Sequence, residues 1–401
     1  MSMRRTPRGS EEARLPTGFR AAGCAAGIKP DGAPDMALLV SDVPAAVAGV
    51  FTTNQVQAAP VRLDRERLAG GCARAVIVNS GIANACTGPA GLRDARRTAR
   101  LAARALGVPE STVFVCSTGS IGRPLPMDRI AGGIARLVPA LAEDGGEAAS
   151  AAIMTTDTRP KRWTVRTRVA GRPVTVCGLA KGAGMIEPNM ATMLAFLTTD
   201  ADVPPRVLQR LLRSAVEATF NRITVDGDRS TNDTVLFLAN GLAGGGALGP
   251  SSRGWPAFRD AVFETADQLA WMIVRDGEGA TKAVTIRVGG ARSNAEADRA
   301  ARSVANSLLV KTAWAGTRPN WGRVMDALGY ARARVEEGKV SIRFDGLPAV
   351  RAGRAGPADP AALEAVVARP EFTVDIRLGL GRGEAVVRTC NCTEDYVRIN
   401  R

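Results

Sequence analysis

The stretch from Lys181 to Leu197 contains the candidate nucleophile, Thr192. Glycines at positions 182 and 184 allow backbone conformations that other residues avoid, and Pro188 fixes a turn. The apolar run that follows predicts a buried strand. A hydroxyl group at the junction of a turn and a strand is well placed for nucleophilic chemistry, whereas the alternative is an ordinary threonine at the start of a core strand.

The chain contains no histidine. A Ser-His-Asp or Cys-His relay, a histidine metal site and a histidine general base are therefore all excluded. Cys390 and Cys392 would share one face of a strand, but no other ligand types stand beside them, so core packing is favoured over a metal site. We expect no metal, and an enzyme built on this chain would need another base.

Three further polar stretches are candidates for a site. Residues 117–122 (STGSIG) follow an expected strand, and such a glycine-rich turn can present backbone N–H groups to a phosphate or an oxyanion. They lack the lysine and spacing of a P-loop, so an ordinary turn is the alternative. Residues 154–158 form a polar cluster, and residues 275–282 place Glu278 between two glycines close to a lysine.

Residues 220–234 are dense in side chains that form hydrogen bonds. Such density is the usual composition of a satisfied turn, because Asn, Asp and Ser side chains bond to their own backbone. We therefore interpret this segment as a turn before a strand.

The composition excludes several classes of protein. The net charge is +14, but the basic residues are spread singly and only five Trp and two Tyr are present to stack bases, so we expect no nucleic acid partner. No apolar run reaches the roughly 18 residues of a membrane span. The first residues have no apolar stretch that would make a secretory signal, which predicts a cytoplasmic protein whose seven cysteines are mostly reduced.

The length of 401 residues predicts one large or two medium layered units. Strands and helices alternate without a strict βαβ rhythm and some strands form hairpins, which favours mixed sheets with helices packed outside. We expect strands at 36–40, 48–52, 75–79, 113–116, 163–169, 173–179, 235–238, 283–288, 340–344, 372–377 and 384–388; helices at 91–106, 127–150, 203–217, 256–273 and 294–309; and loops at 240–254 and 311–323.

The combination of motifs resembles the ornithine acetyltransferase family, also called glutamate N-acetyltransferase, of arginine biosynthesis. The resemblance extends from about Gly18 to Asn400. It is carried by five motifs in order, which are STGSIG at 117–122, KGAGM with PNMATML at 181–194, FNRITVDGD at 220–228, GEGATK at 277–282 and NWGR at 320–323.

This resemblance implies an α/β (α+β) fold, a layered α/β/β/α sandwich with mixed sheets. It also implies a precursor that cuts itself between Ala191 and Thr192. The expected parts are a disordered segment 1–17, an alpha chain 18–191 and a beta chain 192–401 that begins at the nucleophile. The family pattern suggests a heterotetramer of two alpha and two beta chains.

The implied reaction is ping-pong acetyl transfer without a cofactor. Thr192 Oγ takes the acetyl group from N2-acetylornithine and passes it to glutamate, and the freed α-amino group of Thr192, with an ordinary pKa of about 7.7–8.0, replaces the missing histidine as base. Acetyl-CoA is left open as a second donor.

The family pattern also assigns roles to other positions of this chain. Thr118 and Gly119 match the oxyanion hole, where one donor contributes about 2.7–4 kcal/mol of transition-state stabilisation. The substrate-binding positions besides the nucleophile are Thr155, Lys181, Glu278 and Asn400. A lysine and a glutamate suit a zwitterionic amino acid, and the alternative is a structural ion pair.

The resemblance implies one more substrate contact, a threonine beyond Asn400, which this chain does not contain because it ends at Arg401. The acyl donor and acceptor are therefore left open. One alternative is an acyltransferase with a different substrate in a natural-product pathway. Another is an N-terminal-nucleophile amidohydrolase or aminopeptidase, which would pass the acyl group to water, and the last is an uncleaved binding protein.

Overall fold

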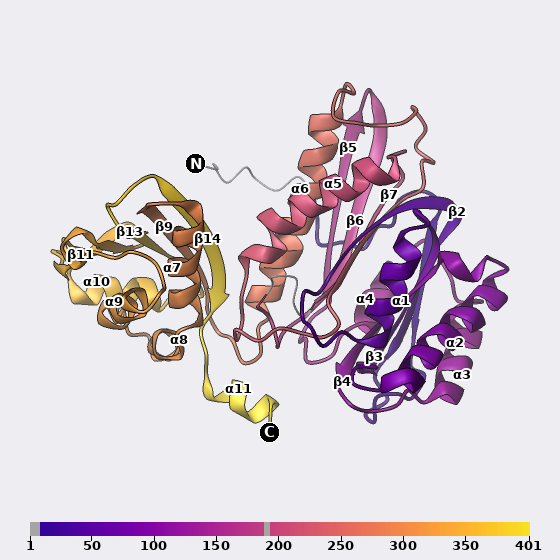
Figure 1. The fold of residues 1–401 in the computed structure, drawn as a ribbon, viewed down its shortest axis with the longest axis horizontal. Helices are drawn as coiled ribbons and strands as arrows, with labels where there is room; N and C mark the ends of the chain where they lie inside the picture. The colour runs from indigo at the N-terminus through magenta and orange to yellow at the C-terminus, as the bar shows by residue number, and fades with distance from the viewer. Residues whose placement is uncertain (1–8, 188–192) are drawn as a thin grey trace. The chain divides into compact units, whose positions relative to one another are not determined.

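The computed structural model describes residues 9–187 and 193–401. The chain divides into two compact units, one made of Met1–Asn221 and Arg229–Met272 and the other of Arg222–Asp228 and Ile273–Arg401 (Figure 1). Each unit contains a sheet with both parallel and antiparallel pairs, so the predicted mixed α/β architecture is confirmed.

The described part of the first unit contains an eight-stranded sheet in the order β4-β3-β2-β8-β7-β6-β5, with β1 paired to β2. The pairs β3/β4 and β7/β8 are parallel and the others are antiparallel. The strands are β1 (Phe19–Cys24), β2 (Met36–Phe51), β3 (Cys72–Ile82), β4 (Val113–Ser120), β5 (Lys161–Val169), β6 (Arg172–Lys181), β7 (Leu194–Thr199) and β8 (Thr234–Ala239).

Successive side chains of a strand point to opposite faces, and this sheet buries both of its faces. In β3, Val76 and Val78 enter one core, whereas Ala75 and Ile77 enter the other. The apolar runs in the sequence are continuous for this reason.

Helices cover the sheet of the first unit. The first three helices share a core with β1, β3 and β4, and α4 lies in the other core (Figure 1). The helices are α1 (Ala59–Leu68), α2 (Gly88–Leu106), α3 (Met127–Leu137), α4 (Gly146–Ala152), α5 (Pro205–Ala218) and α6 (Trp255–Arg275), with short 3-10 turns η1 (Glu110–Thr112) and η2 (Phe220–Arg222).

The second unit has a six-stranded sheet in the order β12-β11-β10-β13-β9-β14, in which β9 and β13 are parallel. Its strands are β9 (Ala283–Ala291), β10 (Ser341–Phe344), β11 (Leu347–Arg351), β12 (Arg354–Ala355), β13 (Glu371–Arg377) and β14 (Gly383–Cys390). Its helices are α7 (Asn294–Asn306), α8 (Leu308–Ala315), α9 (Trp321–Gly329), α10 (Pro360–Val367) and α11 (Glu394–Ile399), with the turn η3 (Glu337–Lys339).

Some predicted elements differ from the structure. The helix expected at 127–150 is split into α3 and α4, and the polar loop expected at 311–323 is wrong because it contains most of α8 and the start of α9. Capping side chains explain why α8 and α9 form. Ser307 accepts a hydrogen bond from Val310 N at the start of α8, and Asn320 accepts one from Arg323 N at the start of α9. Residues 9–17, expected in a disordered segment, include Ser10, which pairs with Thr164.

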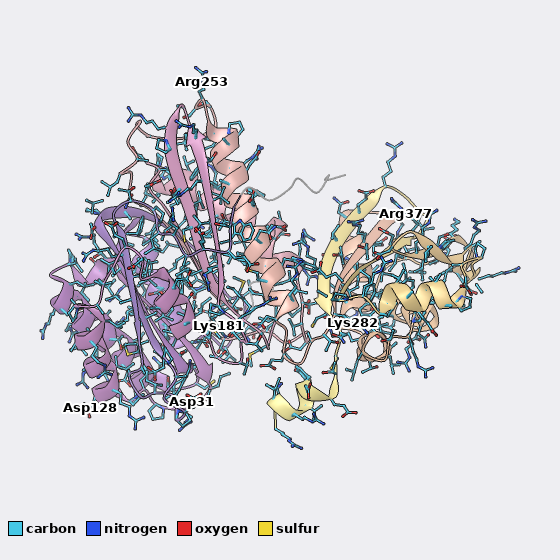
Figure 2. All side chains as sticks on the ribbon, turned by 180° about the vertical axis from the view of Figure 1, so that it is seen from behind. Asp31, Asp128, Lys181, Arg253, Lys282 and Arg377 are labelled. Atoms are coloured by element: carbon cyan, nitrogen blue, oxygen red, sulfur yellow. The ribbon has the colours of Figure 1, made fainter. Side chains whose placement is uncertain are left out.

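Other expectations hold. The strands expected at 163–169 and 173–179 form the hairpin β5/β6, and the loop expected at 240–254 contains neither helix nor strand. Among the described residues, no helix is long and apolar enough to cross a bilayer. Charged side chains cover both units: Arg253 and Arg377 point into solvent, whereas Lys181 lies inside the first unit (Figure 2).

Candidate active site

The segment from Gly182 to Met193 joins two adjacent antiparallel strands. Strand β6 ends at Lys181 and β7 begins at Leu194, and these two residues are paired. Thr192 and Ala191, the expected nucleophile and cleavage partner, lie outside the described residues, as do 188–190. Residues 181–187 and 193–194 flank this position, and their contacts define the surroundings of the candidate site.

Thr118 and Gly119, the expected oxyanion-hole pair, lie within the last residues of strand β4, so the turn expected at 117–122 begins only after Ser120. We call residues 118–122, the end of β4 and the turn that follows it, the oxyanion turn. Strand β4 runs parallel to β3, which places Gly119 opposite Gly81. Gly119 has a φ of +126°, and a Cβ atom added there would lie 2.2 Å from the carbonyl carbon of Gly81. Two backbones approach so closely that only glycine fits. Thr118 is buried and Gly119 is exposed, so the chain passes from core to surface at this turn.

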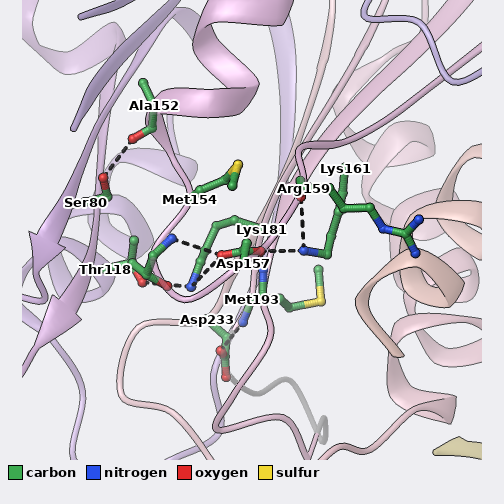
Figure 3. Close-up of polar contacts among 12 residues, drawn as sticks. Ser80, Thr118, Ala152, Met154, Asp157, Arg159, Lys161, Lys181, Met193 and Asp233 are labelled. Atoms are coloured by element: carbon green, nitrogen blue, oxygen red, sulfur yellow. Dashed lines mark hydrogen bonds and ion pairs between the residues drawn. The ribbon is translucent and has the colours of Figure 1, made fainter. Parts of the chain in front are cut away.

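Lys181 connects the end of β6 to this turn. Its Nζ donates to Thr118 Oγ1 at 3.3 Å, although the residues are 63 positions apart (Figure 3). Lys181 is almost completely buried, and a buried ammonium group needs polar partners. Two of the predicted site residues are thus in direct contact.

Asp157 lies at the centre of a buried network. Its carboxylate accepts from Thr155 N at 3.0 Å, from Gly182 N at 2.7 Å and from Lys161 Nζ at 2.6 Å, and one oxygen lies 4.0 Å from Lys181 Nζ (Figure 3). Burial would raise the pKa of Asp157, but the ammonium groups of Lys181 and Lys161 outweigh it and hold the pKa well below its ordinary value. The network joins the predicted residues Thr155 and Lys181.

Lys29 holds the chain just before Thr155. Its Nζ donates to Met154 O at 2.8 Å and to Pro34 O at 2.7 Å. The backbone N–H of Lys29 in turn donates to the buried carboxylate of Asp35 at 3.0 Å. The loop between β1 and β2 therefore supports the predicted substrate-binding segment.

Asn232 and Asp233 lie immediately before β8. Asp233 Oδ1 accepts from Met193 N at 2.7 Å, and Asn232 Nδ2 donates to Ala83 O at 2.6 Å and to Ser117 O at 2.8 Å. Asp233 thus binds Met193, which follows Thr192, and Asn232 binds Ser117, which precedes Thr118. Burial raises the pKa of Asp233 well above its ordinary value.

The remaining predicted pair belongs to the second unit. Asn400 Nδ2 donates to Glu278 Oε2 at 2.6 Å and to Tyr396 O at 2.9 Å, and Glu278 is buried. Thr393 Oγ1 donates to Gly279 O at 2.7 Å, which fixes the start of α11 beside Glu278. The structure therefore brings Glu278 and Asn400 together.

Sequence reasoning missed Asp157, Lys161, Asn232 and Asp233 as members of the site. Asp157 stands in the polar cluster 154–158, and the pair Asn232–Asp233 stands in the polar segment 220–234, which was interpreted as a satisfied turn. The density of acidic and amide side chains was thus the available signal for a site. Their hydrogen-bond partners are distant in the sequence, so the sequence did not show what these side chains bind. Within residues 9–187 and 193–401, no group of three His, Cys, Asp or Glu residues has a geometry that would hold a metal.

Known proteins share this sequence along almost its whole length. The model of the ArgJ family matches residues 20–401. The arginine biosynthesis bifunctional protein ArgJ of Geobacter sulfurreducens is 52% identical over 384 residues, which cover 96% of this chain and 98% of the relative. The protein of the same name from Symbiobacterium thermophilum is 51% identical over 387 residues, 96% of each chain.

Among solved structures, the ornithine acetyltransferase of Mycobacterium tuberculosis in complex with ornithine is 48% identical, covers 46% of this chain and 98% of its own, and has a TM-score of 0.44. The family model covers far more than half of the chain, and the sequence identity to the two relatives is about half over nearly their full length. This chain therefore belongs to the ArgJ family.

Proposed function

We propose that this chain transfers the acetyl group of N2-acetylornithine to glutamate in arginine biosynthesis. The observation that carries the proposal is the 52% identity to an arginine biosynthesis bifunctional protein over 96% of the chain. The name bifunctional, shared by the relatives, supports a second reaction in which acetyl-CoA acetylates glutamate. Both reactions take place in the cytoplasm and need no cofactor.

The nucleophile in this proposal is Thr192, freed by self-cleavage after Ala191. Its Oγ attacks the acetyl carbonyl while its α-amino group accepts the hydroxyl proton, and ornithine leaves. The acetyl ester is then attacked by the amino group of glutamate. Thr118 and Gly119 stabilise the oxyanion of both steps; the support for this role is the close approach of Gly119 to Gly81, which fixes the turn.

Lys181 and Thr155 bind substrate in this proposal. Lys181 is held by Asp157 and reaches Thr118, so its ammonium group suits the α-carboxylate of an amino acid beside the oxyanion turn. Glu278 and Asn400 are assigned to substrate binding as well, where a carboxylate suits the ammonium group of ornithine. Their mutual hydrogen bond of 2.6 Å supports a shared role.

The two products of cleavage, 1–191 and 192–401, would stay associated because they share one sheet. Strand β7, from the second product, pairs with β6 from the first along Val176–Lys181, and β8 pairs with β2 along Ala46–Phe51. Separating the chains would break both ladders and expose two buried cores. A heterotetramer of two alpha and two beta chains follows if two such pairs dimerise.

A denaturing gel with N-terminal sequencing tests the cleavage, and assays with two acetyl donors, N2-acetylornithine and acetyl-CoA, test the chemistry. We expect two fragments, one beginning at Thr192, and acetylglutamate formed from N2-acetylornithine and from acetyl-CoA. Thr192→Ala should give one inactive chain of 41.9 kDa. An uncut chain with full activity would exclude this mechanism, and release of free acetate in place of acetylglutamate would identify a hydrolase.

A further inference from the structure

Asp233 is a buried acid placed beside the proposed cleavage site by strand register. Strands β7 and β8 are parallel and begin together, with Leu194 opposite Thr234. The residues just before them, Met193 and Asp233, are therefore neighbours. Two hydrogen bonds fix them, one from Met193 N to Asp233 Oδ1 at 2.7 Å and one from Thr234 N to Met193 O at 3.1 Å.

The second oxygen of this carboxyl group has no assigned role. Asp233 is fully buried, and Oδ2 has no hydrogen-bond partner among the residues that the structure describes. A buried polar atom without a partner is costly and calls for an explanation. Burial raises the pKa of Asp233 well above its ordinary value, against the opposing effects of the Met193 N–H, Thr52 and Lys181. Burial therefore favours the protonated form of this carboxyl group, and its Oδ2 is the oxygen that can carry the proton.

Covalent geometry keeps the nitrogen of the scissile bond near this acid. The backbone nitrogens of residues 192 and 193 are separated by one α-carbon and one carbonyl carbon, so they lie within about 4 Å of each other in any conformation. Asp233 already binds the second of these nitrogens. The first is the atom that must gain a proton when the Ala191-Thr192 bond breaks.

We propose that Asp233 is the general acid of self-cleavage, which protonates the nitrogen of Thr192 as the peptide bond breaks. This proposal rests on the proposed function, because it requires cleavage between Ala191 and Thr192. Asp233 then has two tasks: Oδ1 orients the residue after the nucleophile, and the proton on Oδ2 activates the leaving group.

The proton balance of the step closes. Thr192 Oγ bonds to the carbonyl carbon of Ala191, and the bond from this carbon to the Thr192 nitrogen breaks. The nitrogen takes the proton of Asp233 and leaves as a neutral amine, while the carboxylate of Asp233 recovers the proton that Thr192 Oγ loses. Water then hydrolyses the Ala191 ester, which frees the hydroxyl group of Thr192.

The substitution Asp233→Asn separates the two tasks. Asparagine has the same shape and its oxygen still accepts from Met193 N, but its amide cannot release a proton. We expect the purified variant to fold and to cleave at least about 100-fold more slowly than the parent, the contribution typical of general acid catalysis. Hydroxylamine, which splits esters and leaves amides intact, should not accelerate its cleavage, because the ester itself does not form.

Asp200→Asn is the matched control. Asp200 follows the other end of β7, is also buried, and accepts from Thr175 N at 2.9 Å, so the substitution makes the same change without touching the cleavage site. It should cleave at the rate of the parent. Asp233→Glu and Asp233→Gln form a second isosteric pair that decides the question if the asparagine variant does not fold: only the glutamate variant should cleave.

The possible failures are distinguishable. Cleavage of Asp233→Asn at the parent's rate, or equal cleavage of the glutamate and glutamine variants, would overturn the acid role and leave the proposed function intact. If the parent itself is not cut before Thr192, the proposed function fails and the role of Asp233 fails with it.

Discussion

Asn232 donates its side-chain amide to the backbone carbonyl of Ser117 at 2.8 Å, although 115 residues separate the two. The same nitrogen donates to Ala83 O at 2.6 Å. Since Ser117 precedes Thr118 and Asp233 holds Met193, two consecutive side chains set the position of the oxyanion turn relative to the start of β7. A misplacement of about 1 Å between such groups is enough to cost 10²-fold in rate.

Asn232→Ala should therefore lower kcat by about 10²-fold while the KM values change little. The loss of two hydrogen bonds to buried carbonyls should also lower the free energy of unfolding by about 1–3 kcal/mol. Steady-state kinetics and thermal unfolding measure the two effects.

Asn240→Ala is the control for this prediction. Asn240 follows the opposite end of β8, and its Nδ2 donates to Thr17 O at 2.9 Å, so a similar bond is lost away from the oxyanion turn. It should reduce stability and leave kcat unchanged. An equal fall of kcat in both variants would show that Asn232 acts on stability alone.

The strands of this protein could be predicted from sequence because each is a short apolar run bounded by turn residues, as at 75–79 and 113–116. The pairing of the strands could not be predicted, because strands that are distant in the sequence lie side by side in the sheet. Strand β8, for example, lies between β2 and β7. The contact between Met193 and Asp233 depends on that pairing. Thr118, Lys181 and Thr155 were predicted from motifs, whereas Asp157 was missed, since its role appears only when β6 returns beside residues 155–161.

Gly119→Ala should inactivate the protein. A methyl group there would lie 2.2 Å from the carbonyl carbon of Gly81, and the φ of +126° is strained for any other residue. The turn must move, and with it the expected oxyanion donors. We expect a loss of kcat of about 10²–10³-fold, as for the removal of one such donor, measured by steady-state acetyl transfer.

Gly122→Ala serves as the control for this turn. Gly122 also has a positive φ, +81°, but a Cβ atom there would meet nothing within 4 Å. It should lose some stability and keep most of its activity. If both alanine variants are equally inactive, backbone strain and not the approach of Gly119 to Gly81 controls the turn.

Asp157→Asn should change how stability depends on pH. Because the pKa of Asp157 is lower in the folded than in the unfolded protein, its ionised form stabilises the fold above the unfolded pKa of about 3.9. This stabilisation is lost progressively as the pH falls below about 4. The parent should therefore lose Tm between pH 5 and pH 3 more steeply than Asp157→Asn does.

At neutral pH, Asp157→Asn should be less stable than the parent by about 3–5 kcal/mol, because two buried ammonium groups lose their partner. Asp128→Asn, which changes an exposed carboxylate, is the control (Figure 2). It should follow the parent's pH profile. Parallel profiles for the parent and Asp157→Asn would contradict a depressed pKa at Asp157.

Lys181→Met should separate substrate binding from stability when it is compared with Lys161→Met. Both lysines are buried and both interact with the carboxylate of Asp157, so both variants should lose stability to a similar extent. Only Lys181 also has a hydrogen bond to Thr118, at 3.3 Å. Loss of a charge-assisted contact of about 1.5–3 kcal/mol to a substrate carboxylate should raise the KM for N2-acetylornithine by about 10–100-fold in Lys181→Met. Lys161→Met, assayed well below its melting temperature, should keep a KM close to that of the parent, and a rise of similar size would show that Lys181 supports the fold and does not bind the substrate.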